Sequence, residues 1–267
     1  MSNPDTHRAR KRFGQNFLHD PAIIERIVDV INPQKDDYIL EIGPGKGALT
    51  RLILERVCEL NVIEIDRDLV KLLETSIGKD ERLKIHQADA LKIDLDQFGQ
   101  NEWRIVGNLP YNISTPLLFH LLNYKHYIKD MLFMLQKEVV DRICAKPGNK
   151  QYGRLSIMLQ YYCDIESLFV IKSGAFIPSP KVDSAIVKLT PLTKPRFELA
   201  SEQSLELIVR EAFSKRRKTI RNGLKKYVDE SDFLKLGIAP EIRAENLAIA
   251  DFVKLANHYH RLKINGL

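Results

Sequence analysis

Short apolar runs alternate with amphipathic segments along the first 150 residues of the chain. Runs of mostly apolar residues are typical of buried strands, and apolar residues three and four positions apart are typical of helices. Asp20 is the expected N-cap of the first helix, with Pro21 at its first position, and Ser114 or Thr115 is the expected cap of a later helix. The predicted strands are residues 37–43, 60–66, 82–90, 103–108 and 130–136, and the predicted helices are residues 21–31, 47–57, 67–77, 114–124 and 137–145. This alternation predicts an α/β fold, with a parallel sheet covered by helices on both faces.

The alternation loosens after residue 150. A helix is predicted at 154–163 and strands at 167–172 and 184–190, with a proline-rich loop at 176–184 between these strands. Residues 190–198 contain two prolines and are predicted to be a linker, after which the patterns at 204–213, 218–227 and 244–262 are all helical. We therefore expect two domains, an α/β domain at 1–195 that carries a basic N-terminal arm and a small helical domain at 196–267.

The composition excludes several classes of protein. The chain has 267 residues, 44% of them hydrophobic, but no apolar run approaches the ~20 residues of a membrane helix. Its first residues have no secretory pattern, so we expect a cytoplasmic protein without a membrane partner. Cys58, Cys144 and Cys163 are far apart, which favours buried reduced thiols, and neither the cysteines nor the histidines form a metal-binding motif. We expect no metal.

Positive charge is concentrated in one place. Residues 210–226 hold eight Lys or Arg and one Glu, a net charge of +7, whereas the whole chain has a net charge of +6. A smaller group, RARKR, lies at residues 8–12. A solvated helix face is the ordinary explanation of such a run, but acidic partners are nearly absent here, so contact with nucleic-acid phosphates is favoured. On charge alone, the predicted RNA-binding residues are Arg216, Arg217, Lys218 and Arg221.

A glycine-rich segment, EIGPGKGALT, connects the first long strand to its helix. Gly43 and its neighbours there allow a ligand to approach the backbone closely. Glu64 follows Gly43 by 21 residues at the end of the next strand, where a carboxylate accepts hydrogen bonds from ribose hydroxyls, with Asp66 as the alternative. Asp89 ends the third strand and is placed to meet an adenine amino group. The loop lacks the GxGxxG spacing that suits a pyrophosphate, so S-adenosylmethionine is favoured over a dinucleotide.

The segment GNLPYN at 107–112 follows the fourth predicted strand and carries more chemistry than a connecting turn needs. The side-chain oxygen of Asn108 and a backbone carbonyl of Pro110 (or Leu109) are acceptors for the two protons of an adenine amine. Such acceptors favour the pyramidal geometry in which that poorly nucleophilic nitrogen attacks a methyl group, and the proline holds them in place. Tyr111 offers a flat face for a flipped-out base. No general base is required, because the proton leaves after methyl transfer.

Several segments together resemble one family, the ribosomal RNA adenine N6-dimethyltransferases, and particularly its bacterial small-subunit branch. The resemblance extends from about residue 8 to the C-terminus. It implies a Rossmann-like class I S-adenosylmethionine-dependent methyltransferase domain followed by a small all-helical domain. The segments that carry it are RFGQNFLHD, EIGPGKGALT, GNLPYN, QKEVVDRI, FIPSPKVDS and AFSKRRKTIRN.

The resemblance also implies roles for individual residues. Asn16 and Leu18 would close over the methionine end of the cofactor, and Phe176 would stack on the target base opposite Tyr111. Asn108 would contact both the cofactor and the target amine, while Gly43, Glu64 and Asp89 keep the cofactor-binding roles given above.

The activity implied by the resemblance is dimethylation of the N6 amines of two adjacent adenines in the loop of the 3′-terminal helix of small-subunit (16S) rRNA. In the family this reaction is linked to late assembly of the 30S subunit. The expected partner is therefore the small ribosomal subunit, and the protein is expected to act as a monomer.

Four alternatives remain open at this stage. A DNA adenine methyltransferase uses the same chemistry, but such enzymes usually carry an acidic residue at the position of Asn108, and the helical domain is small for reading a duplex sequence. A large-subunit rRNA methyltransferase of the same family is the second alternative. An RNA-binding assembly factor whose methylation is incidental, and an NAD-dependent dehydrogenase, complete the set.

Overall fold

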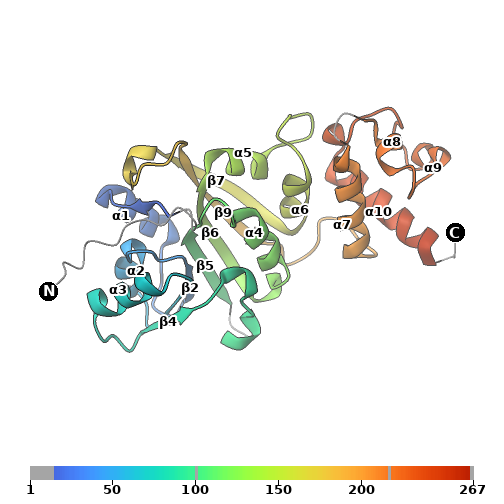
Figure 1. The fold of residues 1–267 in the computed structure, drawn as a ribbon. Coiled ribbons are helices and arrows are strands. Elements are labelled where there is room, and N and C mark those ends of the chain that lie inside the picture. Colours follow the sequence, from blue (N-terminus) through green and yellow to red (C-terminus); the bar gives the residue numbers. More distant parts are fainter. Residues whose placement is uncertain (1–14, 100–101, 216–217, 265–267) are drawn as a thin grey trace. The chain divides into compact units, whose positions relative to one another are not determined.

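The computed structural model describes residues 15–99, 102–215 and 218–264. These residues form two compact units, which are described separately (Figure 1). The first unit holds the described residues up to Val140 together with Ile165–Pro191, and the second holds Asp141–Asp164 and the described chain from Leu192 onwards. The sequence-based boundary at 195/196 therefore leaves residues 141–164 out of the second unit. They belong there because their helix packs against the helix that follows the predicted linker.

A seven-stranded sheet forms the centre of the first unit, in the order β4-β3-β2-β5-β6-β9-β7. The first five of these strands are parallel, and β9 runs antiparallel to β6. All five strands predicted before residue 140 are confirmed, with ends that differ by up to three residues. The strands of the whole seven-stranded sheet are β2 (Tyr38–Ile42), β3 (Leu60–Glu64), β4 (Leu83–Gln87), β5 (Trp103–Asn108), β6 (Ile128–Gln136), β7 (Cys163–Ile171) and β9 (Ser184–Pro191).

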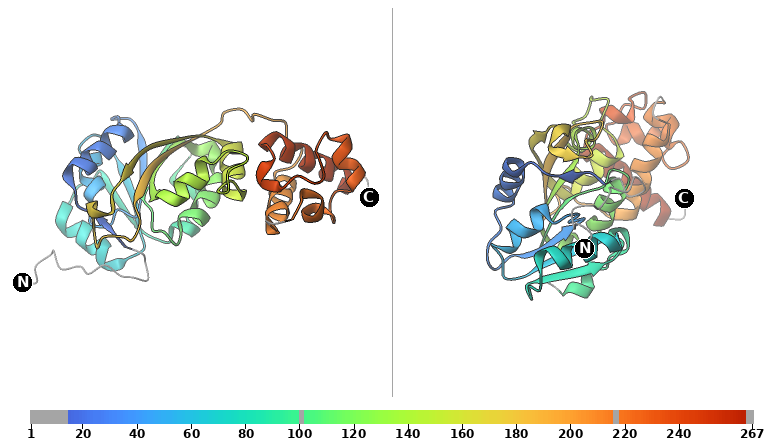
Figure 2. Two further views of the ribbon diagram at one scale, coloured as in Figure 1. Left: turned by 90° about the horizontal axis from the view of Figure 1, so that it is seen from above. Right: turned by 60° about the vertical axis from the view of Figure 1, so that its left-hand side comes forward.

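Helices cover both faces of this sheet (Figures 1 and 2). One face is covered by α1 (Pro21–Ile31), α2 (Ala48–Leu54) and α3 (Arg67–Ile77), and α4 (Ser114–Leu122) lies on the other. The apolar stripes of α1 and α2 pack on the sheet in one continuous core. The helix α5 (Lys137–Cys144) follows β6 directly.

Helix starts were predicted with mixed success. Asp20 caps α1 as expected, and its carboxylate accepts the backbone N–H groups of Ala22 and Ile23 at 3.0 and 3.2 Å. The expected cap of α4 is wrong, because Ile113 occupies the N-cap position and contributes no side-chain bond. The Ser114 hydroxyl instead donates to the carbonyl of Tyr111 at 3.3 Å, so it braces the loop that precedes the helix.

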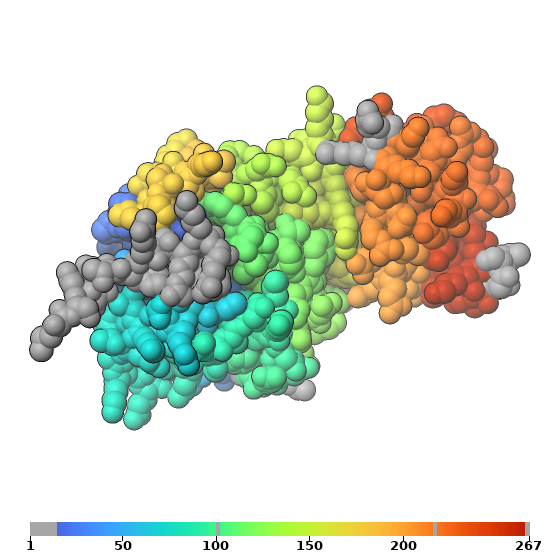
Figure 3. Space-filling view, in the orientation of Figure 1, coloured from blue at the N-terminus to red at the C-terminus, as the bar shows by residue number. Residues whose placement is uncertain are grey.

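A two-stranded ribbon was not predicted from the sequence. Strand β1 (Phe17–Leu18) pairs antiparallel with β8 (Phe176–Ile177), which lies inside the proline-rich segment expected to be a loop. In the space-filling view, the yellow segment that contains β8 lies beside the blue first helix (Figure 3). Two-residue strands carry no periodicity, and a pairing between residues so far apart in sequence leaves no local signal.

The second unit is helical. Its elements are α6 (Arg154–Tyr162), α7 (Glu202–Ser214), α8 (Ile220–Leu224), α9 (Glu230–Lys235) and α10 (Ile249–Ile264). The long helices α7 and α10 pack together around Leu205, Ile208, Phe252 and Leu255, each of which is fully buried. This unit therefore has an apolar core of its own.

The expected burial of the cysteines holds for only one of them. Cys163 is buried, Cys144 is half-buried and Cys58 is exposed, and none of the three forms a disulfide among the described residues. Among the described residues, no helix is long and apolar enough to cross a membrane.

Arg104 on β5 organises the end of the sheet where the parallel strands begin. Its guanidinium forms a bidentate pair with Asp130 on β6, with both N–O distances at 3.0 Å, and it donates to Asp37 ahead of β2 at 2.6 Å. It also donates to the carbonyls of Ile31 and Asn32 at the end of α1. Arg104 is 8% exposed, so these bonds satisfy a buried charge and bring three strands and a helix terminus together.

Substituting Arg104 with alanine is expected to destabilise the protein by about 3–5 kcal/mol, because two buried carboxylates lose their main partner. Urea unfolding followed by circular dichroism measures this change. The matched control is Arg56→Ala, which removes an exposed pair with Asp29 at 3.5 Å and is expected to cost less than about 1 kcal/mol. Equal losses in the two variants would contradict the role assigned to Arg104.

Candidate active site

The glycine-rich segment forms a tight cradle at the carboxyl end of β2. Gly43, Gly45 and Gly47 have φ angles of +70°, +58° and +80°, a region that other residues adopt at a cost. The Gly43 N–H donates to the carbonyl of Ile63 on β3 at 2.9 Å, which ties the cradle to the neighbouring strand. In the sheet, β3 lies on one side of β2 and β5 lies on the other. The cradle at the end of β2 therefore lies at a switch point of the strand order.

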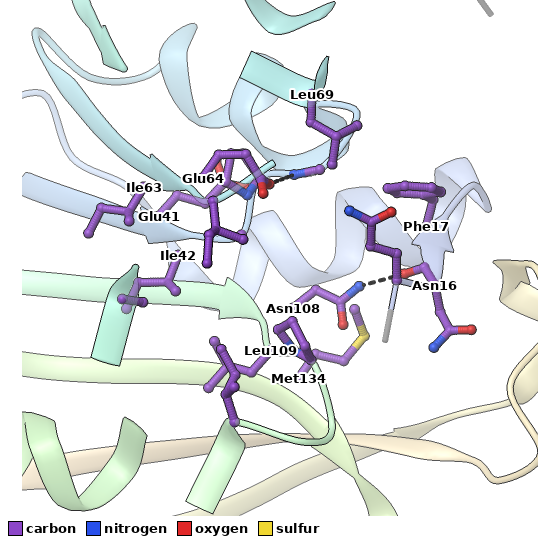
Figure 4. A pocket seen from close by; sticks show the side chains of 18 of the residues that line it. Asn16, Phe17, Glu41, Ile42, Ile63, Glu64, Leu69, Asn108, Leu109 and Met134 are labelled. Atoms are coloured by element: carbon purple, nitrogen blue, oxygen red, sulfur yellow. Dashed lines mark hydrogen bonds between the residues drawn. The ribbon is translucent and has the colours of Figure 1, made fainter. Parts of the chain in front are cut away.

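A pocket of about 230 Å³ opens at this switch point (Figure 4). It is mainly apolar, with Ile42, Ile65, Leu69 and Met134 among its walls, and a few polar groups point into it. Eight of the residues predicted from the sequence line this one pocket. They are Asn16, Leu18, Gly43, Glu64, Asp89, Asn108, Pro110 and Tyr111.

Glu64 and Asp66, which the sequence left as alternatives, have different places. Glu64 lines the pocket, where its carboxylate accepts the backbone N–H of Asp66 at 2.8 Å and that of Gly45 at 3.3 Å. A carboxylate offers about four acceptor positions, so these two bonds leave acceptor capacity for hydroxyl groups of a ligand. Burial raises the pKa of Glu64, and hydrogen bonds from the backbone N–H groups of Asp66, Gly45 and Ile65 oppose that rise.

Asp66 is 1% exposed and caps α3, where its carboxylate accepts the N–H of Asp68 at 3.0 Å. Its other oxygen accepts the side-chain amide of Gln15 at 3.1 Å. Asp66 thus caps α3 and is not among the residues that line the pocket, whereas Glu64 is. The role of Glu64 as a ribose ligand stays a prediction.

Asp89 begins a short turn after β4. One carboxylate oxygen accepts the N–H of Leu91 at 3.0 Å, and the residue lines the pocket next to Leu91. The remaining oxygen can accept a hydrogen bond from an amino group such as that of adenine.

The loop after β5 brings Asn108, Pro110 and Tyr111 to the opposite wall. The Asn108 side-chain amide donates to the backbone carbonyl of Asn16 at 3.0 Å (Figure 4). The Pro110 carbonyl already accepts the N–H of Ile113 at 3.1 Å, whereas the Leu109 carbonyl accepts no bond from the described residues. A carbonyl oxygen has two lone pairs, so both carbonyls that the sequence left open can still accept a hydrogen bond, and the choice between them stays a prediction.

Phe176 lies elsewhere. Its ring is 3% exposed, belongs to the core under α1 and does not line the pocket, while the neighbouring Ile177 is 60% exposed. Stacking of Phe176 on a base would require the ring to leave this packing, and the role stays a prediction.

The predicted RNA-binding residues are partly covered by the structure. Arg216 and Arg217 lie outside the described residues. Lys218 is exposed, and Arg221 pairs with Glu230 at 2.6 Å, which neutralises part of the charge counted in the sequence. No group of three or more His, Cys, Asp or Glu side chains suited to a metal occurs in the described part of the chain.

Glu41 was not predicted to belong to the site. It lies on β2 directly before the glycine cradle, borders the pocket and is 2% exposed, and its Oε2 has no hydrogen-bond partner among the described residues. Burial and the charge of Glu64 raise its pKa from 4.5 to about 7. An acidic residue inside the otherwise apolar run YILEI was the available signal.

The strand order, the glycine cradle and the acidic residues at the end of β3 and after β4 define a Rossmann-like methyltransferase domain. Comparison of the sequence with known protein families identifies the family of this chain. The model of the family described as "Ribosomal RNA adenine dimethylase" matches residues 6–261, so the chain belongs to that family.

Similar proteins span nearly the whole chain. The chain is 52% identical to the Ribosomal RNA small subunit methyltransferase A of Marinomonas sp. (strain MWYL1), covering 97% of this chain and 98% of that protein. It is 51% identical to the protein of the same name from Pseudomonas aeruginosa, covering 99% and 100%.

Two solved structures share the fold. A dimethyladenosine transferase from Plasmodium falciparum has a TM-score of 0.79 at 27% identity, covering 94% of this chain and 98% of that one. The 23S rRNA methyltransferase ErmE has a TM-score of 0.71 at 26% identity, covering 93% and 100%.

The buried Glu41 predicts a pH-dependent cost to stability. Its folded-state pKa lies above the ordinary value of 4.5, so the folded protein holds a proton that the unfolded chain releases, and stability falls as the pH rises from about 4.5 to about 7. That shift corresponds to about 3 kcal/mol. Substituting Glu41 with glutamine is expected to stabilise the protein at pH 8 by up to this amount, but not at pH 4.5.

Thermal unfolding of the two proteins at both pH values measures the difference. The control is Glu74→Gln on the exposed side of α3. A gain in stability that is the same at pH 4.5 and pH 8 would contradict this account of Glu41.

Proposed function

We propose that this protein transfers methyl groups from S-adenosylmethionine to the N6 amines of two adjacent adenines in the loop of the 3′-terminal helix of 16S rRNA. It acts in the cytoplasm as a monomer, on the small ribosomal subunit late in its assembly. The observation that carries the proposal is the meeting of Glu64, Asp89 and the Asn108 loop in one pocket around the glycine cradle.

The pocket residues fit this cofactor. Glu64 and Asp89 keep acceptor capacity for the ribose hydroxyls and the adenine amine respectively, and Ile65 and Leu69 supply apolar walls. Gly43 has a φ of +70°, which favours glycine, and a Cβ atom there would only make an ordinary contact of 3.6 Å with the Asn108 carbonyl oxygen. The segment from Asn16 to Leu18 borders the same pocket and is assigned to the methionine end.

The Asn108 loop serves the incoming adenine. When bound, the cofactor supplies a methyl group on a positively charged sulfur. The Oδ1 of Asn108 and the backbone carbonyl of Pro110 (or Leu109) accept the two amine protons, which localises the nitrogen lone pair for attack. The methyl group would pass from sulfur to the nitrogen, with the electrons of the broken sulfur–carbon bond left on sulfur, and a proton would then leave the nitrogen for water. Tyr111 provides a stacking surface, and Pro110 stiffens the loop.

The similarity to named relatives supports the choice of RNA. The chain is 51–52% identical to proteins named for the ribosomal RNA small subunit, but only 26% identical to the 23S rRNA methyltransferase ErmE. The neutral Asn108 argues against a DNA adenine methyltransferase. Lys218 and the neighbouring basic residues supply positive charge for phosphate contacts.

The test is methyl transfer from labelled S-adenosylmethionine to small subunits that lack the modification. We expect dimethyladenosine in 16S rRNA and no label in large subunits or DNA. Substituting Asn108 with alanine should reduce transfer at least ~100-fold, the scale of losing one aligned acceptor, with subunit binding nearly unchanged. Label on another substrate, or an active alanine variant, would contradict the proposal. Binding without any transfer by the unaltered protein would favour an assembly factor.

Neutralising Arg216, Arg217 and Lys218 together with glutamine is expected to weaken subunit binding. It should also reduce the slope of log affinity against log salt by about 2–3, because each lost phosphate contact removes just under one released counterion. Filter binding at several salt concentrations measures both. The control neutralises the exposed Lys35, Lys79 and Lys84, which lie outside the basic segment. An unchanged slope would mean that the basic segment is only a solvated surface.

A further inference from the structure

The side-chain amide of Asn108 has a defined orientation. Its Nδ2 donates to the carbonyl oxygen of Asn16 at 3.0 Å (Figure 4). If the amide were turned over, two oxygens would face each other at that distance, and the hydrogen bond would become a repulsion. The Asn16 carbonyl therefore fixes the amide nitrogen on its own side, and Oδ1 is left for a different partner.

The residues around Asn16 hold its carbonyl in place. We call Gln15–Leu18 the N-terminal strap. The Gln15 amide donates to the buried Asp66 at 3.1 Å, and the Phe17 ring lies so close to Gly45 that a Cβ there would approach it to 3.1 Å. Leu18 is 7% exposed in the core, and β1 pairs with β8. The strap is thus anchored on three sides.

We propose that the main-chain carbonyl of Asn16 is a positioning group for methyl transfer, which directs Oδ1 of Asn108 toward the target amine and requires asparagine rather than aspartate at residue 108. The inference rests on the proposed function, because it assigns Oδ1 to the adenine amine. It explains why a neutral amide stands where an acidic residue would accept the same amine proton equally well.

Aspartate at residue 108 would behave differently in its two protonation states. When ionised, it would place an oxygen against the Asn16 carbonyl and repel it. When protonated, it would donate to that carbonyl and leave its other oxygen for the amine. The Asn108→Asp variant should therefore gain activity as the pH falls.

Other charges face the same pocket. They are Glu41 from β2, Lys46 from the glycine cradle, Glu64 from β3 and Asp89 after β4, with Tyr111 on the Asn108 loop and Asp66 behind Gln15. The carboxylates raise the pKa of an aspartate at residue 108, and Lys46 together with a cationic cofactor lowers it. These opposing effects set the pH at which the activity of the aspartate variant changes, but they do not abolish the change.

The experiment measures single-turnover methyl transfer on small subunits between pH 5.5 and 8.5 with saturating cofactor. Unaltered protein should have a nearly flat profile. Asn108→Asp should be at least ~100-fold slower at pH 8 and should gain about tenfold for each pH unit below, as for one ionising group. Asn108→Ala, the matched control, should be slow throughout. Melting temperatures verify that the variants fold.

An Asn108→Asp variant as active as the unaltered protein at pH 8, or as slow and as flat as Asn108→Ala, would overturn the inference. Amide hydrogen exchange tests the inference without measuring activity. A failure of the inference can therefore be distinguished from a failure of the proposed function. The Asn108 side-chain amide signals, assigned by their loss in Asn108→Asp, should exchange at least ~10-fold more slowly than those of the exposed Asn112. Equal exchange would overturn the inference as well.

Discussion

The parallel register of β2, β3 and β5 is the constraint on which the site depends. Ile42 on β2 lies opposite Ile63 on β3, and Glu41 lies opposite Val106 on β5. Because the strands run in the same direction and are aligned, their carboxyl ends emerge at one level. The glycine cradle, Glu64 and the Asn108 loop therefore meet, although they are far apart in the chain. The strap then closes the same pocket from the N-terminal side.

The two ends of the sheet differ in how completely their buried charged groups are paired. At the end where the strands begin, Arg104 is saturated by two carboxylates and two carbonyls, which favours rigidity. At the end where they finish, Glu64 keeps acceptor positions available, and Glu41 is buried with an oxygen that lacks a partner among the described residues. A stability cost at the ligand end is the usual consequence of preparing groups for a ligand.

Sequence patterns predicted most of this arrangement because its parts are local. The periodicity of apolar residues and the residues typical of element ends located the parallel strands and α1. Residues at the carboxyl ends of parallel strands lie at one edge of the sheet, so Glu64, Asp89 and Asn108 could be placed together. Interactions between distant segments were not accessible. The pairing of β1 with β8, the packing of α6 against α7 and the bond from Asn108 to the Asn16 carbonyl all join segments with no shared periodicity. The structure was also needed to see which of Glu64 and Asp66 lines the pocket, because the sequence does not reveal that Asp66 caps α3.

The proposed function requires that the pocket at the switch point holds S-adenosylmethionine through Glu64. We would measure this binding by titration calorimetry of the protein with S-adenosylmethionine, and separately with NAD. We expect one S-adenosylmethionine per chain and no heat from NAD. We also expect Glu64→Gln to weaken binding at least ~10-fold, about 1.4 kcal/mol, and Glu74→Gln to leave it unchanged. Binding of NAD alone, or an affinity for S-adenosylmethionine that is the same in Glu64→Gln, would contradict the claim.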